Sequence, residues 1–275
     1  MQPTFEQTQP NAQTEERAQR WSPLLLAGGL VLAFLAAPWS LEHKAHAALH
    51  GLCAQTPSHT FLMGGRPLPF DSRMTGIYGG FAIGFACLAL IGRHRSARLP
   101  SFSLMALLAA FVGVMAIDGF NSLFLDLGKP HPYQPDNRLR LLTGIGTGIS
   151  LAVILCYLIG VTLWRRPDTK QPVVTWRDLG IVLPMQLPFV LLILSGWAWL
   201  SAPLTIGLVM ASLAVLTTLA LVAIVLIKRL DYSFDGIGEL HAHATAAMVV
   251  AVAIMAMLAS GRFLLEHITG IQTLP

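Results

Sequence analysis

Two arginines and one aspartate lie within or beside long apolar segments, where such side chains can bind an anion or pair with each other. Arg73 and Arg140 stand at the start of two apolar runs, and Asp118 lies near the end of a third. A carboxylate inside a membrane span is costly unless it is paired. We therefore expect Asp118 to face the protein interior, with Arg73 or Arg140 as its partner.

The neighbouring residues extend these three into a candidate binding site. The amino-terminal end of a helix offers free N–H groups and a positive dipole end, which favour negative ligands. Two arginines beside two such ends suit a carboxylate or the phosphate of a lipid head group. The predicted ligand-binding group is Arg73, Thr75, Asp118, Asn137 and Arg140. A structural ion pair that binds no ligand is the alternative interpretation.

A second set of chemically capable side chains lies in "LEHKAHAALHGLC", residues 41–53. His46, His50 and Cys53 are spaced so that a helix would place them on one face. Histidine and cysteine at such spacing can bind zinc or copper, which makes them a candidate metal site. The spacing matches no established zinc motif, and a solvated helix rich in histidine is the alternative. No other cofactor is indicated.

The amino-acid composition indicates a protein embedded in a membrane. Hydrophobic residues make up 54% of the 275 residues and charged residues 12%, and the mean hydropathy is +0.63. Soluble domains carry about twice that charged fraction. The three cysteines have no regular spacing, which argues against a disulfide framework. We therefore expect an all-α integral membrane protein whose main partner is the lipid bilayer, and no nucleic-acid partner.

Seven apolar runs are long enough to cross a bilayer, which takes about 17–25 residues. They lie near residues 22–40, 75–92, 101–120, 141–164, 179–199, 203–227 and 243–265. Of the 18 Lys and Arg residues, 11 fall at one set of helix ends and 7 at the other. Cytoplasmic loops carry the excess of Lys and Arg. The sequence thus predicts a bundle of about seven helices, with the N-terminus inside and the C-terminus outside.

This pattern divides the chain into three regions. Residues 1–21 are polar and are expected to form a disordered cytoplasmic tail. Residues 22–165 would form a membrane core, and residues 166–275 would supply three C-terminal spans. A cleaved signal peptide is an alternative for the first span, with an Ala-His-Ala cleavage site at 45–47, and its removal would leave six spans.

Glycines recur every four residues at the start of two spans. They are Gly76, Gly80 and Gly84 in one span, and Gly144 and Gly148 in the other. Small residues at this spacing let transmembrane helices pack closely. The surrounding sequences are also alike, "RMTGIYGG" at 73–80 and "RLLTGIGTG" at 140–148. The likeness indicates either a parallel repeat of helix pairs or chance in a chain rich in glycine and leucine.

The fifth span contains Pro184 and Pro188 with Gln186 between them. Each proline removes a backbone hydrogen bond and kinks the helix. The segment is typical either of a broken helix beside a cavity or of a structural kink.

The segment "CAQTPSHTFLMGGRPLPFDSRMTGIYGG", residues 53–80, resembles a prokaryotic membrane family named domain of unknown function 2085. The hallmark of that family is Cys-His-Gln followed by Pro-Leu-Cys-x-Arg-Cys-Thr-Gly-Ile-Tyr. The matching residues are Cys53, Gln55, Phe61, Gly65, Leu68, Pro69, Arg73, Thr75, Gly76, Ile77 and Tyr78. Further similarity at "IDGF" and "NRLRLLTG" extends the resemblance over about residues 45–150. It implies a multi-pass protein of a prokaryotic cytoplasmic membrane.

The departures from this motif bear on the candidate metal site. The motif cysteines and histidine look like metal ligands or a thiol site, but here Ala54, Asp71 and Met74 replace three of the four. A metal site inferred for the family would therefore require His50, His59 or Asp71 to substitute for a lost ligand here. By contrast, Arg73 and Thr75 of the motif are retained.

Three functional hypotheses follow. The first is binding or transport, without chemistry, of an anionic small molecule or lipid head group at an extracytoplasmic site. The second is a structural or accessory subunit of a larger membrane complex. The third is a metal-handling membrane protein or enzyme that uses the His/Cys loop. The sequence has no H-E-x-x-H, G-x-S-x-G or Walker-type motif, so enzymatic activity is not expected.

Overall fold

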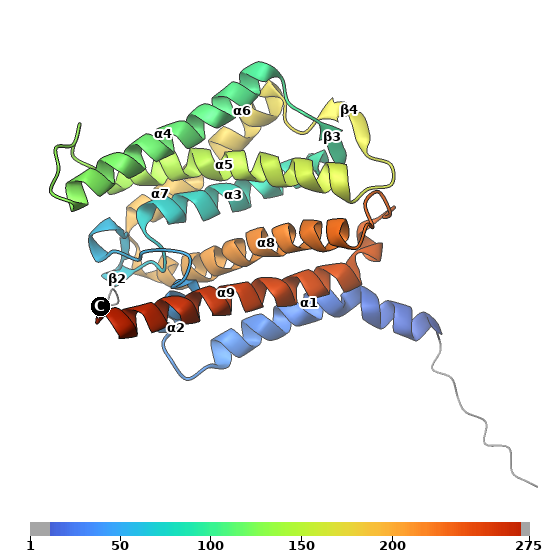
Figure 1. Ribbon diagram of the computed structural model, residues 1–275, viewed down its shortest axis with the longest axis horizontal. Coiled ribbons are helices and arrows are strands. Elements are labelled where there is room, and N and C mark those ends of the chain that lie inside the picture. The colour runs from blue at the N-terminus through green and yellow to red at the C-terminus, as the bar shows by residue number, and fades with distance from the viewer. Residues whose placement is uncertain (1–11, 271–275) are drawn as a thin grey trace, which may run out of the picture.

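The computed structural model describes residues 12–270, and helices dominate it (Figure 1). The helices are α1 (Ala12–Ala36), α2 (Leu41–Leu49), α3 (Ser72–Leu90), α4 (Phe102–Asp126), α5 (Asn137–Thr162), α6 (Trp176–Met185), α7 (Leu187–Ser195), α8 (Ser201–Ile227) and α9 (His241–Thr269). The strands are β1 (Leu62–Met63), β2 (Arg66–Pro67), β3 (Ser96–Arg98) and β4 (Asp168–Pro172). β1 and β2 pair antiparallel, and β3 and β4 pair parallel.

Within residues 12–270, six segments are long and apolar enough to cross a membrane. They are α3, α4, α5, α6 with α7, the segment Ala198–Ile227 that contains α8, and α9. The apolar part of α1, Trp21–Ala36, is shorter than these six. The expectation of an all-α multi-pass membrane protein is therefore confirmed, with six long spans and one shorter apolar helix where seven comparable spans were expected.

The amino-terminal segment is helical over part of the expected tail. α1 begins at Ala12, so the helix includes the second half of residues 1–21, while residues 1–11 lie outside the described residues. α1 lies against α9, where Ser22 Oγ and Thr245 Oγ1 are 2.9 Å apart. Figure 1 shows α9 between α1 and α8.

The connectors gather at two opposite ends of the bundle. At one end, β3 pairs with β4, and Arg95 donates to the Asp235 carbonyl at 2.9 Å. At the other end, the Gly64 amide donates to the Gly196 carbonyl at 2.8 Å, and Asn137 donates to the Ser58 carbonyl at 3.1 Å. These are the same two groups of connectors that the sequence places on opposite sides of the membrane. Which end faces the cytoplasm stays a prediction from the Lys and Arg distribution.

The central contact of the bundle is between α3 and α5, and glycines make it possible. A Cβ atom added to Gly76 would collide with the Leu141 carbonyl oxygen, and one added to Gly144 would collide with the Arg73 carbonyl oxygen. In the most apolar stretch of α5, 67% of the residues are buried inside the protein. The corresponding share is 17% in α4 and in α9. α5 is therefore the enclosed helix around which the other spans pack, and its glycines allow backbone-to-backbone contact with α3.

The two similar segments noted in the sequence meet at this contact. Gly80 lies so close to α5 that a Cβ would approach the Ile145 carbonyl oxygen to 2.7 Å. The "RMTGIYGG" and "RLLTGIGTG" segments thus pack against each other at the start of two neighbouring helices. This explains their shared glycines by packing, and their origin as a repeat stays a prediction.

The fifth span is broken at Gln186, between the two prolines. α6 ends at Met185 and α7 begins at Leu187. The Gln186 side chain is buried and its amide nitrogen lies 3.4 Å from the Gly80 carbonyl oxygen. The break therefore directs a polar side chain towards the α3 backbone.

Adding a methyl group at the α3–α5 contact should destabilise the protein. Gly144→Ala places a Cβ against the α3 backbone, and overpacking of this kind costs about 1–3 kcal/mol. Gly113→Ala in α4 is the matched control, because a Cβ there meets nothing within 4 Å. Thermal unfolding of both variants in detergent checks this, and equal melting temperatures for the two would contradict the assigned contact.

Candidate functional site

Two capped helix ends place Arg73 and Arg140 next to each other. Asp71 caps α3, its carboxylate accepting from the Met74 amide at 2.8 Å. Asp136 caps α5 in the same way, through the Arg138 amide at 3.1 Å. Both arginines therefore lie in the first turn of a helix, and the α3–α5 glycine contact brings these two turns together.

Asp118 forms the ion pair that the sequence predicts for it, with Arg73 as the partner. Arg73 Nη2 lies 2.6 Å from Asp118 Oδ2. The other carboxylate oxygen, Oδ1, accepts a hydrogen bond from the Tyr133 hydroxyl at 2.8 Å. Asp118 is 1% exposed, so both of its oxygens are satisfied away from solvent.

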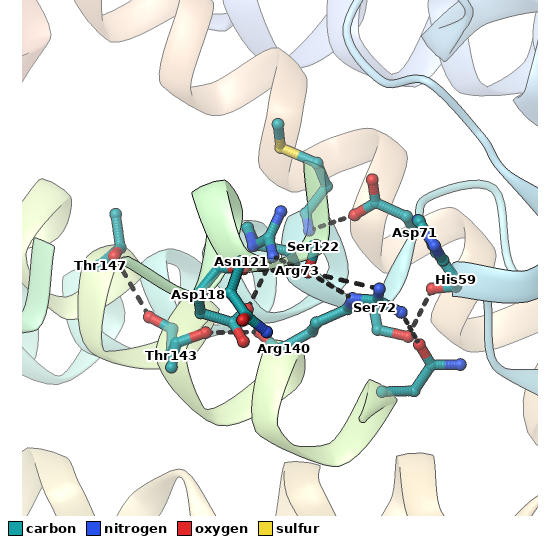
Figure 2. Close-up of polar contacts among 12 residues, drawn as sticks. His59, Asp71, Ser72, Arg73, Asp118, Asn121, Ser122, Arg140, Thr143 and Thr147 are labelled. Carbon is teal, nitrogen blue, oxygen red and sulfur yellow. Dashed lines mark hydrogen bonds and ion pairs between the residues drawn. The ribbon is translucent and has the colours of Figure 1, made fainter. Parts of the chain in front are cut away.

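Arg140 lies beside this pair but contacts only neutral groups. Its Nε and Nη2 atoms each lie 3.4 Å from Ser122 Oγ, and Nη1 donates to Asn137 Oδ1 at 2.8 Å. Arg73 Nη2 also lies 3.3 Å from Ser122 Oγ. Figure 2 shows both guanidinium groups converging on Ser122. Over the described residues, no carboxylate oxygen lies within 4.0 Å of Arg140, so the cluster holds two cations and one anion.

The structure joins four of the five predicted ligand-binding residues into this group and leaves one out. Asn137 links the group to the preceding loop by donating to the Ser58 carbonyl. Thr75 is fully buried, and its hydroxyl donates to the Phe70 carbonyl at 3.3 Å. Thr75 therefore supports the start of α3 and lies outside the hydrogen-bond network of the arginines.

Two residues of the group were missed by sequence reasoning. Ser122 lies four residues after Asp118, so helical spacing places it on the same face of α4, and this signal could have found it. Tyr133 comes from the loop between α4 and α5, where no spacing rule applies. Burial and its hydrogen bond to Asp118 both raise the pKa of Tyr133, so this hydroxyl remains a donor.

Two of the three candidate metal residues, His50 and Cys53, are used for other contacts. His50 is fully buried, with Nδ1 2.9 Å from Gln55 Oε1 and Nε2 2.9 Å from Glu266 Oε2. Burial and the nearby Asp71 carboxylate raise the pKa of Cys53 to about 12, and the thiolate is the form that binds metals. In the described part of the chain, no three His, Cys, Asp or Glu side chains are placed to hold a metal ion. His46, His50 and Cys53 are thus not brought together as ligands.

The loop that carries these residues is attached to α9 by one arginine. Arg262 donates to the carbonyl oxygens of His50 at 2.7 Å and Ala54 at 2.9 Å, and also to that of Cys53. It also pairs with Glu266 at 3.1 Å. The last span therefore supplies the hydrogen-bond donors for the chain segment that precedes α3.

Comparison with known proteins covers the part of the chain that holds the arginine cluster. Residues 53–154 match the family described as "Predicted membrane protein (DUF2085)". The DUF2085 segment includes α3, α4 and most of α5, and with them both arginines and Asp118. No curated protein and no solved structure matches the chain. The resemblance expected from the sequence is therefore confirmed, and α6 to α9 lie outside the DUF2085 segment.

One retained position of the DUF2085 motif, Gln55, and one replaced position, Asp71, have structural roles. The Gln55 side-chain oxygen accepts a hydrogen bond from His50 Nδ1 at 2.9 Å, and its amide nitrogen donates to the His46 and Pro69 carbonyls, both at 3.0 Å. Asp71, at a motif cysteine position, provides the cap of α3. The motif region of this chain thus shapes the loop that leads into Arg73.

Removing the Asp118 charge should be strongly destabilising. Asp118→Asn leaves Arg73 without its ion-pair partner, and breaking a buried pair costs about 3–5 kcal/mol. Asp126→Asn is the control in the same helix, because the Asp126 side chain is 50% exposed and lies 3.6 Å from His59. Its loss should cost about 1 kcal/mol or less. Chemical or thermal unfolding of the two variants measures the difference, and similar losses would argue against a buried pair.

Burial of His46 should make the protein less stable in acid. Burial lowers the pKa of His46 below 6.5 and outweighs the nearby Glu42 carboxylate, which raises it. The unfolded chain therefore binds a proton there first, and the free energy of unfolding falls as the pH drops below 6.5. His46→Gln should reduce this loss between pH 7 and pH 5, whereas His43→Gln at an exposed position should not. An unchanged pH profile of stability in His46→Gln would contradict the prediction.

Proposed function

We propose that this multi-pass membrane protein binds an anionic group, a carboxylate or phosphate of a small molecule or lipid head group, between Arg73 and Arg140. One observation carries the proposal. Arg140 is 4% exposed, and its guanidinium contacts only the neutral oxygens of Ser122 and Asn137. Asp118 neutralises Arg73, and one positive charge remains in a mostly buried site.

Electrostatics favours an anion beside such a charge. An unpaired buried ion carries a desolvation penalty of several kcal/mol, which an opposite charge offsets. Arg73 Nε is also buried without a hydrogen-bond partner among the described residues. The site therefore has spare donor capacity as well as spare charge.

The geometry of the donors suits an oxyanion. A guanidinium group presents its N–H donors in a planar fork that matches carboxylate and phosphate oxygens. Ser122 Oγ receives long contacts of 3.3 and 3.4 Å from both arginines, so one anion oxygen near Ser122 would replace weak neutral contacts with charge-assisted ones. Asn137 orients Arg140 and connects it to the loop around Ser58.

The same contacts also support the second hypothesis, a structural or accessory role. Arg73, Asp118 and Arg140 come from α3, α4 and α5, so their hydrogen bonds join three spans at one end of the bundle. A purely structural cluster would leave ligand binding unaffected by any variant that still folds. The extracytoplasmic location of the site follows from the predicted orientation of the chain. Transport of the anion would be a further step beyond its binding.

Replacing Arg140 should remove a preference for anionic lipid. The purified protein is incubated with equal amounts of dioleoylphosphatidylglycerol and dioleoylphosphatidylcholine, and retained lipid is measured by native mass spectrometry. We expect the wild-type protein to favour the anionic lipid about tenfold, the effect of one charge-assisted hydrogen bond. Arg140→Gln should lose this preference. Arg138→Gln changes the net charge equally but at an exposed position, and should keep it.

Free inorganic phosphate distinguishes a small anion from a head group. Thermal stabilisation of the wild-type protein by phosphate, absent in Arg140→Gln, would indicate that the anion alone is bound. A wild-type protein with neither lipid preference nor phosphate stabilisation would contradict the proposal and leave the structural role. If Arg140→Gln does not fold, Arg140→Lys replaces it in both measurements. This variant keeps the positive charge but loses the planar fork of donors, so anion binding should weaken.

A further inference from the structure

An apolar cavity of about 340 Å³ lies between α1, α2, α8 and α9, apart from the arginine cluster. Its lining includes Leu30 and Phe34 of α1, Ala47 and Ala48 of α2, Met210 of α8 and Phe263 of α9. Figure 1 shows α1, α9 and α8 running side by side, with α2 at one end of them. Because α8 and α9 are long apolar spans, the cavity extends along the hydrocarbon region of the membrane.

A polar pocket of about 240 Å³ adjoins the apolar cavity at its α2 end. Ala47 and Phe263 line both spaces. The polar pocket is also lined by Ser40, Glu42, His43 and His46. Together the two spaces form one site that is apolar along the spans and polar at the end of the bundle, which is the shape of a site for an amphiphilic molecule.

A buried lysine lies beside the apolar cavity, in contact with two residues of α1 that line it. Lys44 is 8% exposed, and its Nζ donates to the Leu35 carbonyl at 2.7 Å and lies 6.0 Å from the centre of the Phe34 ring. Phe34 and Leu35 both line the cavity. Lys44, Ala47 and Ala48 share one face of α2 by their spacing. Lys44 therefore places a positive charge directly behind the part of the cavity wall that Phe34 and Leu35 form.

The lysine has donor capacity that the protein leaves unused. An ammonium group offers three N–H donors, and the one hydrogen bond that the Lys44 ammonium group makes within the described chain is to the Leu35 carbonyl. No carboxylate of the described residues lies within 4.0 Å of it, since the neighbouring Glu42 pairs with Arg66 at 3.4 Å. A buried charge without a counter-ion calls for an anionic partner.

We propose that this site binds a single-chain fatty acid, with the aliphatic chain in the apolar cavity and the carboxylate at Lys44. Burial of the aliphatic chain away from water supplies most of the affinity. One lysine balances the single charge of a carboxylate, whereas a doubly charged phosphate would keep one buried negative charge without a partner. The site shares no residue with the arginine cluster, and the inference is independent of the anion site proposed there.

Oleic acid and oleyl alcohol test the proposal, because they share a chain and differ in the charge of the head. Binding of each to the delipidated full-length protein in detergent is measured by native mass spectrometry. We expect oleate to bind at least tenfold more tightly than the alcohol. Lys44→Met, which keeps the aliphatic stem, should remove this difference. Equal binding of acid and alcohol to the wild-type protein would overturn the assignment of Lys44.

The apolar cavity is tested by filling it. Ala256 lines the cavity on α9, and Ala256→Trp should abolish oleate binding. Ala253→Trp is the matched control, because Ala253 is an exposed position of α9 outside the cavity lining. Oleate binding that survives in Ala256→Trp would overturn the proposal. So would a tightly retained two-chain phospholipid that oleate does not displace. Arg140→Gln should leave oleate binding unchanged, which separates the two sites.

Discussion

The backbone contact between α3 and α5 is the constraint on which the rest of the structure depends. Glycines at 76, 80, 144 and 148 let two helices approach until carbonyl oxygens of one lie against Cα atoms of the other. This contact brings the first turns of both helices to one level, and each turn carries an arginine. Two like charges are thereby forced into one place, and α4 compensates by contributing Asp118 and Ser122 from consecutive turns of one face.

Much of this arrangement could be predicted from local patterns in the sequence. Long apolar runs define the spans because a bilayer requires backbone hydrogen bonds within each segment. The four-residue glycine spacing indicated close packing, and the cost of a carboxylate in a span indicated that Asp118 would find an arginine. The break at Gln186 follows from the two prolines that flank it. In each case one chemical property, the small size of glycine, the charge of aspartate or the missing N–H of proline, limits which groups can lie next to the residue.

Contacts between distant segments could not be predicted in this way. The choice of Arg73 over Arg140 as the partner of Asp118, and the hydrogen bond from Tyr133, depend on how α4 and its loop pack against α3. The helical spacing of His46, His50 and Cys53 indicated one shared face. The chain leaves its helix after Leu49, however, and Gln55 and Glu266 engage His50. Spacing along a helix says nothing about the partner that another span provides.

The three carbonyl bonds of Arg262 have a consequence for how the chain can be divided. The DUF2085 segment begins at Cys53, yet the carbonyl groups of Cys53 and Ala54 receive their donors from α9, more than two hundred residues later. A fragment bounded by the family match would lose these donors at its very first residues. The hydrogen bonds that complete the start of the DUF2085 segment therefore come from a helix that lies outside that segment.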